Sequence, residues 1–160
     1  MSGMEYFAYG SNMNPERLRT LGVAFAARRP ACLPGWRIVF RKCASDAGPV
    51  PRYAYATIEP AAGAVVEGVL YALSGASALA RLDEFEGVPD LYRRQTVPVQ
   101  TDGGAPCPAA IYVARPEVCA DGLLLEDWYR AHLLAAADLL SPDYVRFLSG
   151  LPVVQTAPRW

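Results

Sequence analysis

Residues 6–18 read Tyr6-Phe7-Ala8-Tyr9-Gly10-Ser11-Asn12-Met13-Asn14-Pro15-Glu16-Arg17-Leu18 and predict a strand, a tight turn containing glycine, and the start of a helix. The aromatic and small residues at the beginning are typical of a short buried strand. Asn14 is a favourable N-cap, and Pro15 is favoured at the first position of a helix. Free backbone N–H groups in such a turn, next to a helix N-terminus, can bind an anion. A turn with a purely structural role is the alternative for this segment alone.

A second helix is predicted over residues 74–87, with Ser74 as the N-cap and Gly87 as the residue that ends it. Its apolar face is formed by Ala78, Leu79, Leu82 and Phe85. Glu86 projects into this face, between Leu79 and Leu82. Burial and the negative end of the helix dipole both disfavour a charged carboxylate, so we expect the pKa of Glu86 to be raised. Such a carboxylate can transfer protons near neutrality, unless Glu86 turns out to solvent at the helix end.

Taken together, these two segments resemble the γ-glutamylcyclotransferase-like family. The specific parts are YFAYGSNM at residues 6–13 and the Glu86-Gly87 pair within LDEFEG at residues 82–87. The resemblance covers nearly the whole chain and extends to Ala56-Thr57-Ile58, Val66-Glu67-Gly68-Val69-Leu70-Tyr71, Tyr92, Tyr129, Ala135-Ala136-Ala137 and Pro142-Asp143-Tyr144. The segment between Ala137 and Tyr144 is shorter than the family pattern, which bears on the outer wall of the pocket and on substrate preference.

The resemblance implies an intramolecular reaction, in which the α-amine of a γ-glutamyl compound attacks its own γ-carbonyl. The products are 5-oxoproline and an amino acid or amine. One carboxylate can serve as general base and then as general acid, and this role falls to Glu86. No metal, cofactor or covalent intermediate is required. The expected substrate-binding residues are Tyr9, Gly10, Ser11, Asn12, Tyr92 and Tyr129.

Each group of binding residues has a distinct expected contribution. Backbone N–H groups of Gly10, Ser11 and Asn12 would bind the substrate carboxylate or the oxyanion. The tyrosines would supply hydroxyl donors or ring walls, although buried tyrosines usually serve packing. Two alternatives remain open. One is a specialised cyclotransferase acting on a γ-glutamyl amine or an antibiotic precursor. The other is a non-catalytic small-molecule binding domain on the same scaffold, which would have no need to bury a carboxylate at position 86.

The strand and helix patterns predict an α+β fold, a small mixed β-barrel of about six strands with flanking helices, forming a single domain over residues 1–160. The expected strands are the N-terminal one and residues 36–41, 53–58, 65–73, 92–100 and 109–114. Gly68 suggests a bulge or a close approach of two backbones. The expected helices are residues 14–21, 74–87, 126–139 and 141–150. Residues 155–160 are expected to form a terminal arm that could be mobile.

Composition narrows the class of function. The net charge of −1 offers no basic surface for nucleic acid or an anionic membrane. No apolar run approaches the roughly 20 residues that span a bilayer, and the first residues lack the layout of a signal peptide. We therefore expect a cytoplasmic protein, a monomer or homodimer, whose partner is a small-molecule γ-glutamyl substrate.

The chain also lacks the sequence patterns of metal and nucleotide sites. Its cysteines are scattered without a C-x-x-C pair, at Cys32, Cys43, Cys107 and Cys119. The single histidine, His132, is expected inside a helix, so neither a zinc site nor a Ser-His or Cys-His system is indicated. There is no G-x-G-x-x-G motif and no P-loop lysine, so no nucleotide cofactor is expected.

Overall fold

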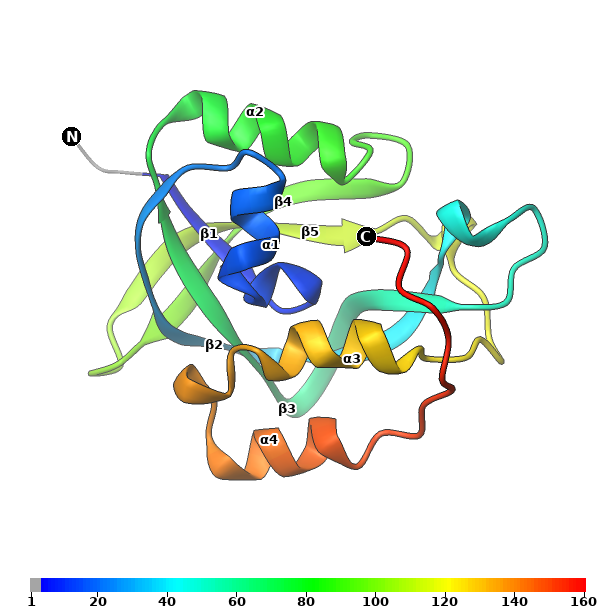
Figure 1. The fold of residues 1–160 in the computed structure, drawn as a ribbon. Helices are drawn as coiled ribbons and strands as arrows, with labels where there is room; N and C mark the ends of the chain where they lie inside the picture. The colour runs from blue at the N-terminus through cyan, green and yellow to red at the C-terminus, as the bar shows by residue number, and fades with distance from the viewer. Residues whose placement is uncertain (1–3) are drawn as a thin grey trace.

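The computed structural model describes residues 4–160, which form a closed five-stranded barrel with four α-helices outside it (Figure 1). The strands are β1 (Met4–Ala8), β2 (Phe25–Cys43), β3 (Ala54–Leu73), β4 (Tyr92–Thr101) and β5 (Pro106–Ala114). They follow one another around the barrel in the order β1-β3-β2-β4-β5. β1 pairs with β5 in parallel and all other pairs are antiparallel, so the barrel is mixed. The predicted fold class is confirmed.

The prediction of about six strands is wrong by one, because residues 53–58 and 65–73 belong to one strand. Within β3 the register jumps from Trp36↔Pro60 to Pro34↔Val65, so residues between these pairs bulge out of the ladder. A bulge of this kind accommodates proline and glycine without ending the strand. β2 likewise begins at Phe25, well before the predicted start, since its first half pairs with the end of β3.

Gly68 marks a close approach of two backbones, which is one of the two roles predicted for it, the other being a bulge. A Cβ atom at this position would lie 2.3 Å from the carbonyl oxygen of Ala8 and 2.8 Å from the Phe7 ring. Only glycine therefore lets β3 pair with β1 at this point.

Helices α1 (Pro15–Thr20) and α4 (Pro142–Ser149) begin as the sequence predicts. The Asn14 side chain accepts a hydrogen bond from the N–H of Glu16 at 3.1 Å. The Ser141 hydroxyl accepts one from the N–H of Tyr144 at 3.2 Å. Both are ordinary side-chain caps. A 3₁₀ turn, η1 (Ser11–Met13), lies between β1 and α1.

Two helix predictions need correction. α2 (Ala76–Phe85) begins after Gly75 rather than after Ser74, and no side-chain cap bond forms there. α3 (Asp127–Leu134) stops earlier than predicted, because the chain changes to a 3₁₀ turn over Ala137–Leu139. The predicted end of α2 is confirmed, since Gly87 has a φ of +63°, a left-handed conformation that glycine adopts readily.

α2 covers one side of the barrel, while α3 and α4 pack on the opposite side (Figure 1). The α2 residues Ala78, Leu79 and Leu82 are buried, whereas Phe85, predicted on the same face, is 46% exposed. Phe85 is the last residue of α2, and it lines a cavity instead of packing in the core. Within residues 4–160, every helix is too short or too polar to traverse a lipid bilayer.

Candidate active site

A cavity of about 340 Å³ opens where the loop after β1 meets the end of α2, a size that suits a small molecule. The lining residues come from elements far apart in the chain, including β1, β2, β3, β4, α3 and the C-terminal segment. All seven residues predicted for the site line this cavity, namely Tyr9, Gly10, Ser11, Asn12, Glu86, Tyr92 and Tyr129.

Glu86 is the C-cap residue of α2, and its N–H donates to the carbonyl oxygen of Leu82 at 2.9 Å. Its side chain is half-buried and its exposed part faces the cavity, so the alternative of a carboxylate turned out to bulk solvent is wrong. Burial raises the pKa of Glu86 to about 7, although attraction to Lys42 and then to Arg17 works in the opposite direction. The predicted direction of this shift is confirmed.

Asn12 connects the loop to this carboxylate. It is buried, and its side-chain amide donates to Glu86 Oε1 at 3.3 Å and to the Tyr6 hydroxyl at 3.0 Å. The backbone carbonyl oxygen of Asn12 accepts a hydrogen bond from the Tyr71 hydroxyl at 2.8 Å. The backbone and the side chain of Asn12 are therefore both hydrogen-bonded, and its side-chain amide contacts one oxygen of Glu86.

Gly10 and Ser11 begin the 3₁₀ turn, whose first N–H groups have no acceptor within the turn itself. The φ of Gly10 is −109°, which lies outside the left-handed region that favours glycine. The space around Gly10 is tight, because a Cβ atom would lie 3.1 Å from the Tyr129 hydroxyl and 3.4 Å from Ala56 Cβ. Glycine here keeps the turn close to the cavity wall.

The three predicted tyrosines are all buried and all hydrogen-bonded to backbone groups. Tyr9 donates to the carbonyl oxygen of Tyr112. Tyr92 donates to the carbonyl oxygen of Ala56 at 3.0 Å, and Tyr129 accepts from the N–H of Ala56 at 2.9 Å. The hydroxyl protons of Tyr9 and Tyr92 are thus already used, which favours these two residues as ring walls. Burial and then the charge of Glu86 raise the pKa of both, so they stay protonated.

Sequence reasoning missed Lys42, the only lysine of the chain. It is 3% exposed and lines the cavity, with its ammonium 5.5 Å from the Tyr55 ring centroid and 5.8 Å from that of Tyr92. The register runs from Val39↔Thr57 to Lys42↔Tyr55, which leaves one extra residue on β2. Such a bulge redirects side chains, so alternation along the strand does not predict where the lysine points.

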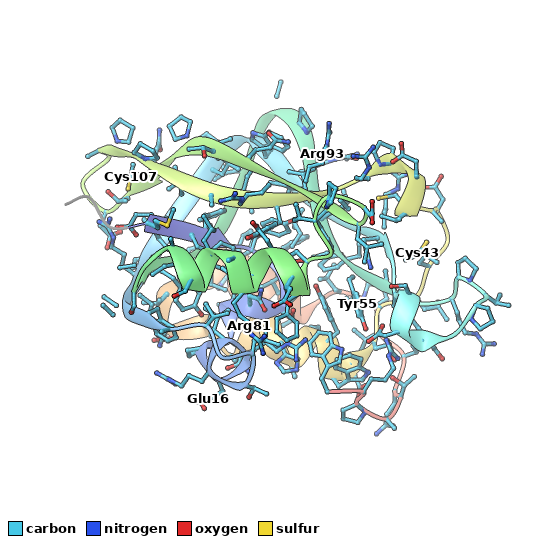
Figure 2. All side chains as sticks on the ribbon, turned by 90° about the horizontal axis from the view of Figure 1, so that it is seen from above. Glu16, Cys43, Tyr55, Arg81, Arg93 and Cys107 are labelled. Atoms are coloured by element: carbon cyan, nitrogen blue, oxygen red, sulfur yellow. The ribbon has the colours of Figure 1, made fainter. Side chains whose placement is uncertain are left out.

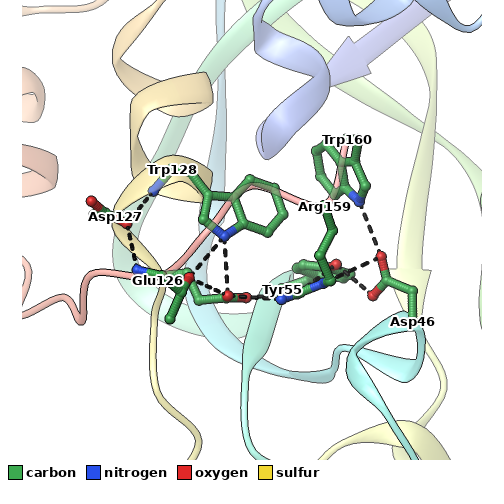
Figure 3. A network of polar contacts seen from close by, with 8 residues as sticks. Asp46, Tyr55, Glu126, Asp127, Trp128, Arg159 and Trp160 are labelled. Carbon is green, nitrogen blue, oxygen red and sulfur yellow. Dashed lines mark hydrogen bonds and ion pairs between the residues drawn. The ribbon is translucent and has the colours of Figure 1, made fainter.

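Trp160 was also missed, because residues 155–160 were expected to form an arm that could be mobile. The structure instead fixes this segment to the barrel through Glu126, which has no exposed surface (Figure 3). Glu126 accepts hydrogen bonds from Arg159 at 2.6 and 2.7 Å and from Trp128 Nε1 at 3.0 Å. The Trp160 ring then lies 3.6 Å from the Arg17 guanidinium, and both residues line the cavity.

Aromatic rings form the wall below α2. Among them is Tyr55, labelled in Figure 2, whose ring stacks on Tyr129 with centroids 5.0 Å apart. By contrast, the segment between Ala137 and Tyr144, expected to bear on the outer wall, is held away from the lining. There Glu67 accepts hydrogen bonds from the N–H of Ser141 at 2.8 Å and from its hydroxyl at 2.6 Å. The cavity lining instead includes Trp160 from the C-terminal segment.

The cysteines and the histidine of the described part of the chain do not form a group of metal ligands. The four cysteines are free thiols, and Cys43 and Cys107 lie at distant parts of the barrel (Figure 2). His132 lies in α3, as predicted, and its Nδ1 is 3.0 Å from the side-chain amide of Asn14. Among residues 4–160, no three His, Cys, Asp or Glu side chains are grouped as metal ligands would be.

Comparison with known proteins places this geometry in a family. The family model described as gamma-glutamyl cyclotransferase, AIG2-like, matches residues 6–130. A solved structure described as gamma-glutamyl cyclotransferase is similar with a TM-score of 0.79 at 25% identity, over 98% of this chain and 92% of its own. An uncharacterized protein from Homo sapiens has a TM-score of 0.79 at 26% identity, over 99% of this chain and 94% of its own. YkqA from Bacillus subtilis has a TM-score of 0.77 at 28% identity, over 96% of this chain and 57% of its own. No curated protein matches.

Proposed function

The chain belongs to the gamma-glutamyl cyclotransferase, AIG2-like family, and on this basis we propose that it cyclises a γ-glutamyl compound to 5-oxoproline. The observation that carries the proposal is Glu86, a cavity-lining carboxylate whose pKa burial raises to about 7. A group with this pKa takes up and releases a proton with equal ease near neutrality, which the reaction requires of it at successive steps.

The chemistry begins at the α-amine of the substrate. Glu86 takes a proton from the ammonium, and the freed nitrogen attacks the γ-carbon to form the new C–N bond. Since both reacting groups belong to one molecule, the cavity only has to fold them into contact. The tetrahedral intermediate then collapses, its oxyanion becomes the lactam carbonyl, and the bond to the leaving nitrogen breaks. In total, two protons leave the attacking nitrogen and two reach the leaving nitrogen, so a carboxylate that relays each one ends unchanged.

The loop after β1 supplies the binding half of the site. We assign the N–H groups of Ser11 and Asn12 to the α-carboxylate of the γ-glutamyl group, because the start of the 3₁₀ turn leaves them without acceptors in that turn. The side-chain amide of Asn12 positions Glu86 from the same loop, at 3.3 Å. Tyr92 and Tyr129 shape the wall that bends the substrate, held in place by their bonds to Ala56.

Incubation of the purified protein with a panel of γ-glutamyl amino acids and γ-glutamyl amines, with 5-oxoproline measured by mass spectrometry, tests this function. Formation of 5-oxoproline that depends on Glu86 is the expected result. Glu84→Gln is the matched control, since Glu84 lies on the same helix but is exposed and paired with Arg81 at 3.3 Å. Binding of γ-glutamyl compounds by calorimetry without any 5-oxoproline would replace the enzyme with a non-catalytic binding domain.

A further inference from the structure

Lys42 is a buried cation without a carboxylate partner in the described part of the chain. Every ion pair among residues 4–160 is made by an arginine. The carboxylates that act on Lys42 from a distance are Glu86 and Asp46, both in the cavity lining. The rings of Tyr55 and Tyr92 offer a cation–π environment at 5.5 and 5.8 Å. These rings offset only part of the cost of removing an ammonium from water, so the site is suited to an anion from solution.

Lys42 also lines the same cavity as Glu86, the proposed general base. Its charge lowers the pKa of Glu86 more than the charge of Arg17 does, which makes it the dominant cation acting on that carboxylate. The Arg17 guanidinium is already engaged with the Trp160 ring at 3.6 Å. An anion bound by Lys42 would therefore lie in the same cavity as Glu86. It would be a group of the same substrate molecule whose nitrogen exchanges protons with Glu86.

The chemistry of the substrate says which anion this is. A γ-glutamyl amino acid carries two carboxylates, one on the γ-glutamyl group and one on the amino acid that leaves. Each is two bonds away from a nitrogen that exchanges protons with the general base. A γ-glutamyl amine carries only the first. The cavity lining offers two separate groups of hydrogen-bond donors for these carboxylates, the N–H groups of Ser11 and Asn12 assigned above and the ammonium of Lys42.

We propose that Lys42 binds the carboxylate of the leaving amino acid, so that this cavity selects γ-glutamyl amino acids over γ-glutamyl amines. The proposal rests on the cyclotransferase function and on the assignment of the loop to the γ-glutamyl carboxylate. A neutral leaving group would cover the Lys42 ammonium without giving it a carboxylate, and sites that lose a polar partner in this way discriminate strongly.

Three substrates of nearly identical shape test this directly. γ-Glutamyl-alanine has the second carboxylate, γ-glutamyl-ethylamine lacks only that group, and γ-glutamyl-alaninamide replaces it with a neutral group of the same size. For the unaltered protein, kcat/KM should favour γ-glutamyl-alanine by about 10- to 100-fold over both neutral compounds. In Lys42→Met this preference should fall to about threefold or less, because a charged hydrogen bond has been removed. Ratios between substrates cancel any effect of Lys42 on Glu86 that all three share.

Arg37→Met is the matched control, since Arg37 lies on the same strand but is exposed and paired with Glu59 outside the cavity. It should keep the preference of the unaltered protein. Equal losses of kcat/KM for all three substrates in Lys42→Met would overturn the proposal and assign Lys42 to the γ-glutamyl half or to Glu86. Absence of 5-oxoproline from every substrate would instead refute the cyclotransferase function itself.

A second measurement does not depend on the folding of Lys42→Met. Because Lys42 is the only lysine, ¹³C-lysine labelling gives a single side-chain ε-CH₂ signal in NMR spectra. In an inactive Glu86→Gln background, this signal should shift on binding γ-glutamyl-alanine and shift much less on binding γ-glutamyl-ethylamine. Equal shifts with the two compounds, or no preference in the unaltered protein, would overturn the assignment.

Discussion

Glu86→Gln should abolish most turnover and, above neutral pH, make the fold more stable. Glutamine has the size of glutamate and keeps the oxygen that accepts a hydrogen bond from Asn12 at 3.3 Å. It cannot carry a proton between the two nitrogens of the substrate. Loss of a general acid/base typically reduces kcat by about 10²- to 10⁴-fold, which is the expected result here.

The stability effect follows from the pKa of Glu86, which burial raises from an ordinary 4.5 to about 7. The folded protein then holds this proton more tightly than the unfolded chain. The stability linked to protonated Glu86 is fully present below pH 4.5 and is lost as the pH rises to about 7. The full shift of the Glu86 pKa corresponds to about 3 kcal/mol in the free energy of unfolding. Because the carboxylate faces an open cavity, water reduces this cost, and we expect about 1–3 kcal/mol.

Urea denaturation of both proteins at pH 4, 6 and 8 measures this difference. The free energies of unfolding should coincide at about pH 4, and Glu86→Gln should be more stable by about 1–3 kcal/mol at about pH 8. The kcat/KM of the unaltered enzyme should rise with pH around a midpoint of about 7, as the base form of Glu86 accumulates.

Glu84→Gln should leave both measurements unchanged. Asp83→Asn is a poorer control, since Asp83 accepts from the Tyr112 hydroxyl at 2.7 Å and pairs with Arg94 at 3.2 Å. If Glu86→Gln is clearly less stable than the unaltered protein at pH 8, Glu86 forms a structural ion pair with Lys42 or Arg17. Near-normal turnover in the same variant would remove Glu86 from the catalytic role.

Four further predictions follow from other contacts. Gly10→Val should lower kcat/KM by about 10²-fold by pushing the turn away from Tyr129, while unfolding by urea should change little; unchanged kinetics would remove this loop from the site. Crystals grown with 5-oxoproline should hold its carboxylate at the N–H groups of Ser11 and Asn12, and a ligand bound far from both this loop and Glu86 would refute the assignment. Arg159→Met should cost about 3 kcal/mol in urea unfolding, because Glu126 is left buried and unpaired; a loss below about 1 kcal/mol would mean that the tail is not held by this pair. Gly68→Ala should cost about 1–3 kcal/mol, because its Cβ would meet the Ala8 carbonyl oxygen at 2.3 Å, and an unchanged thermal midpoint would contradict that contact.

The parts of the fold that sequence predicts are those fixed by neighbouring residues. The N-cap bond from Asn14 to Glu16 spans two residues, and the left-handed φ of Gly87 is set where α2 ends. The first and last residues of a strand depend instead on the strands that pair with it, which are far away in the sequence. Pro60 and Gly63 lie between the two strands predicted there, yet β3 continues past them because it bulges at this point and pairs with β2 on both sides of the bulge.

The same contrast between local motifs and distant contacts applies to the proposed reaction and to the proposed specificity of the site. Glu86 and Asn12 each lie in a short motif with its own local signal, and their side chains meet in the cavity at 3.3 Å. Lys42 reaches the cavity only because a bulge redirects β2, and Trp160 only because a buried ion pair to Glu126 holds the tail. Neither event leaves a periodic pattern in the chain. The short motifs therefore indicate the family and the cyclisation that we propose, whereas the proposed choice of leaving group depends on residues that only the folded barrel brings together.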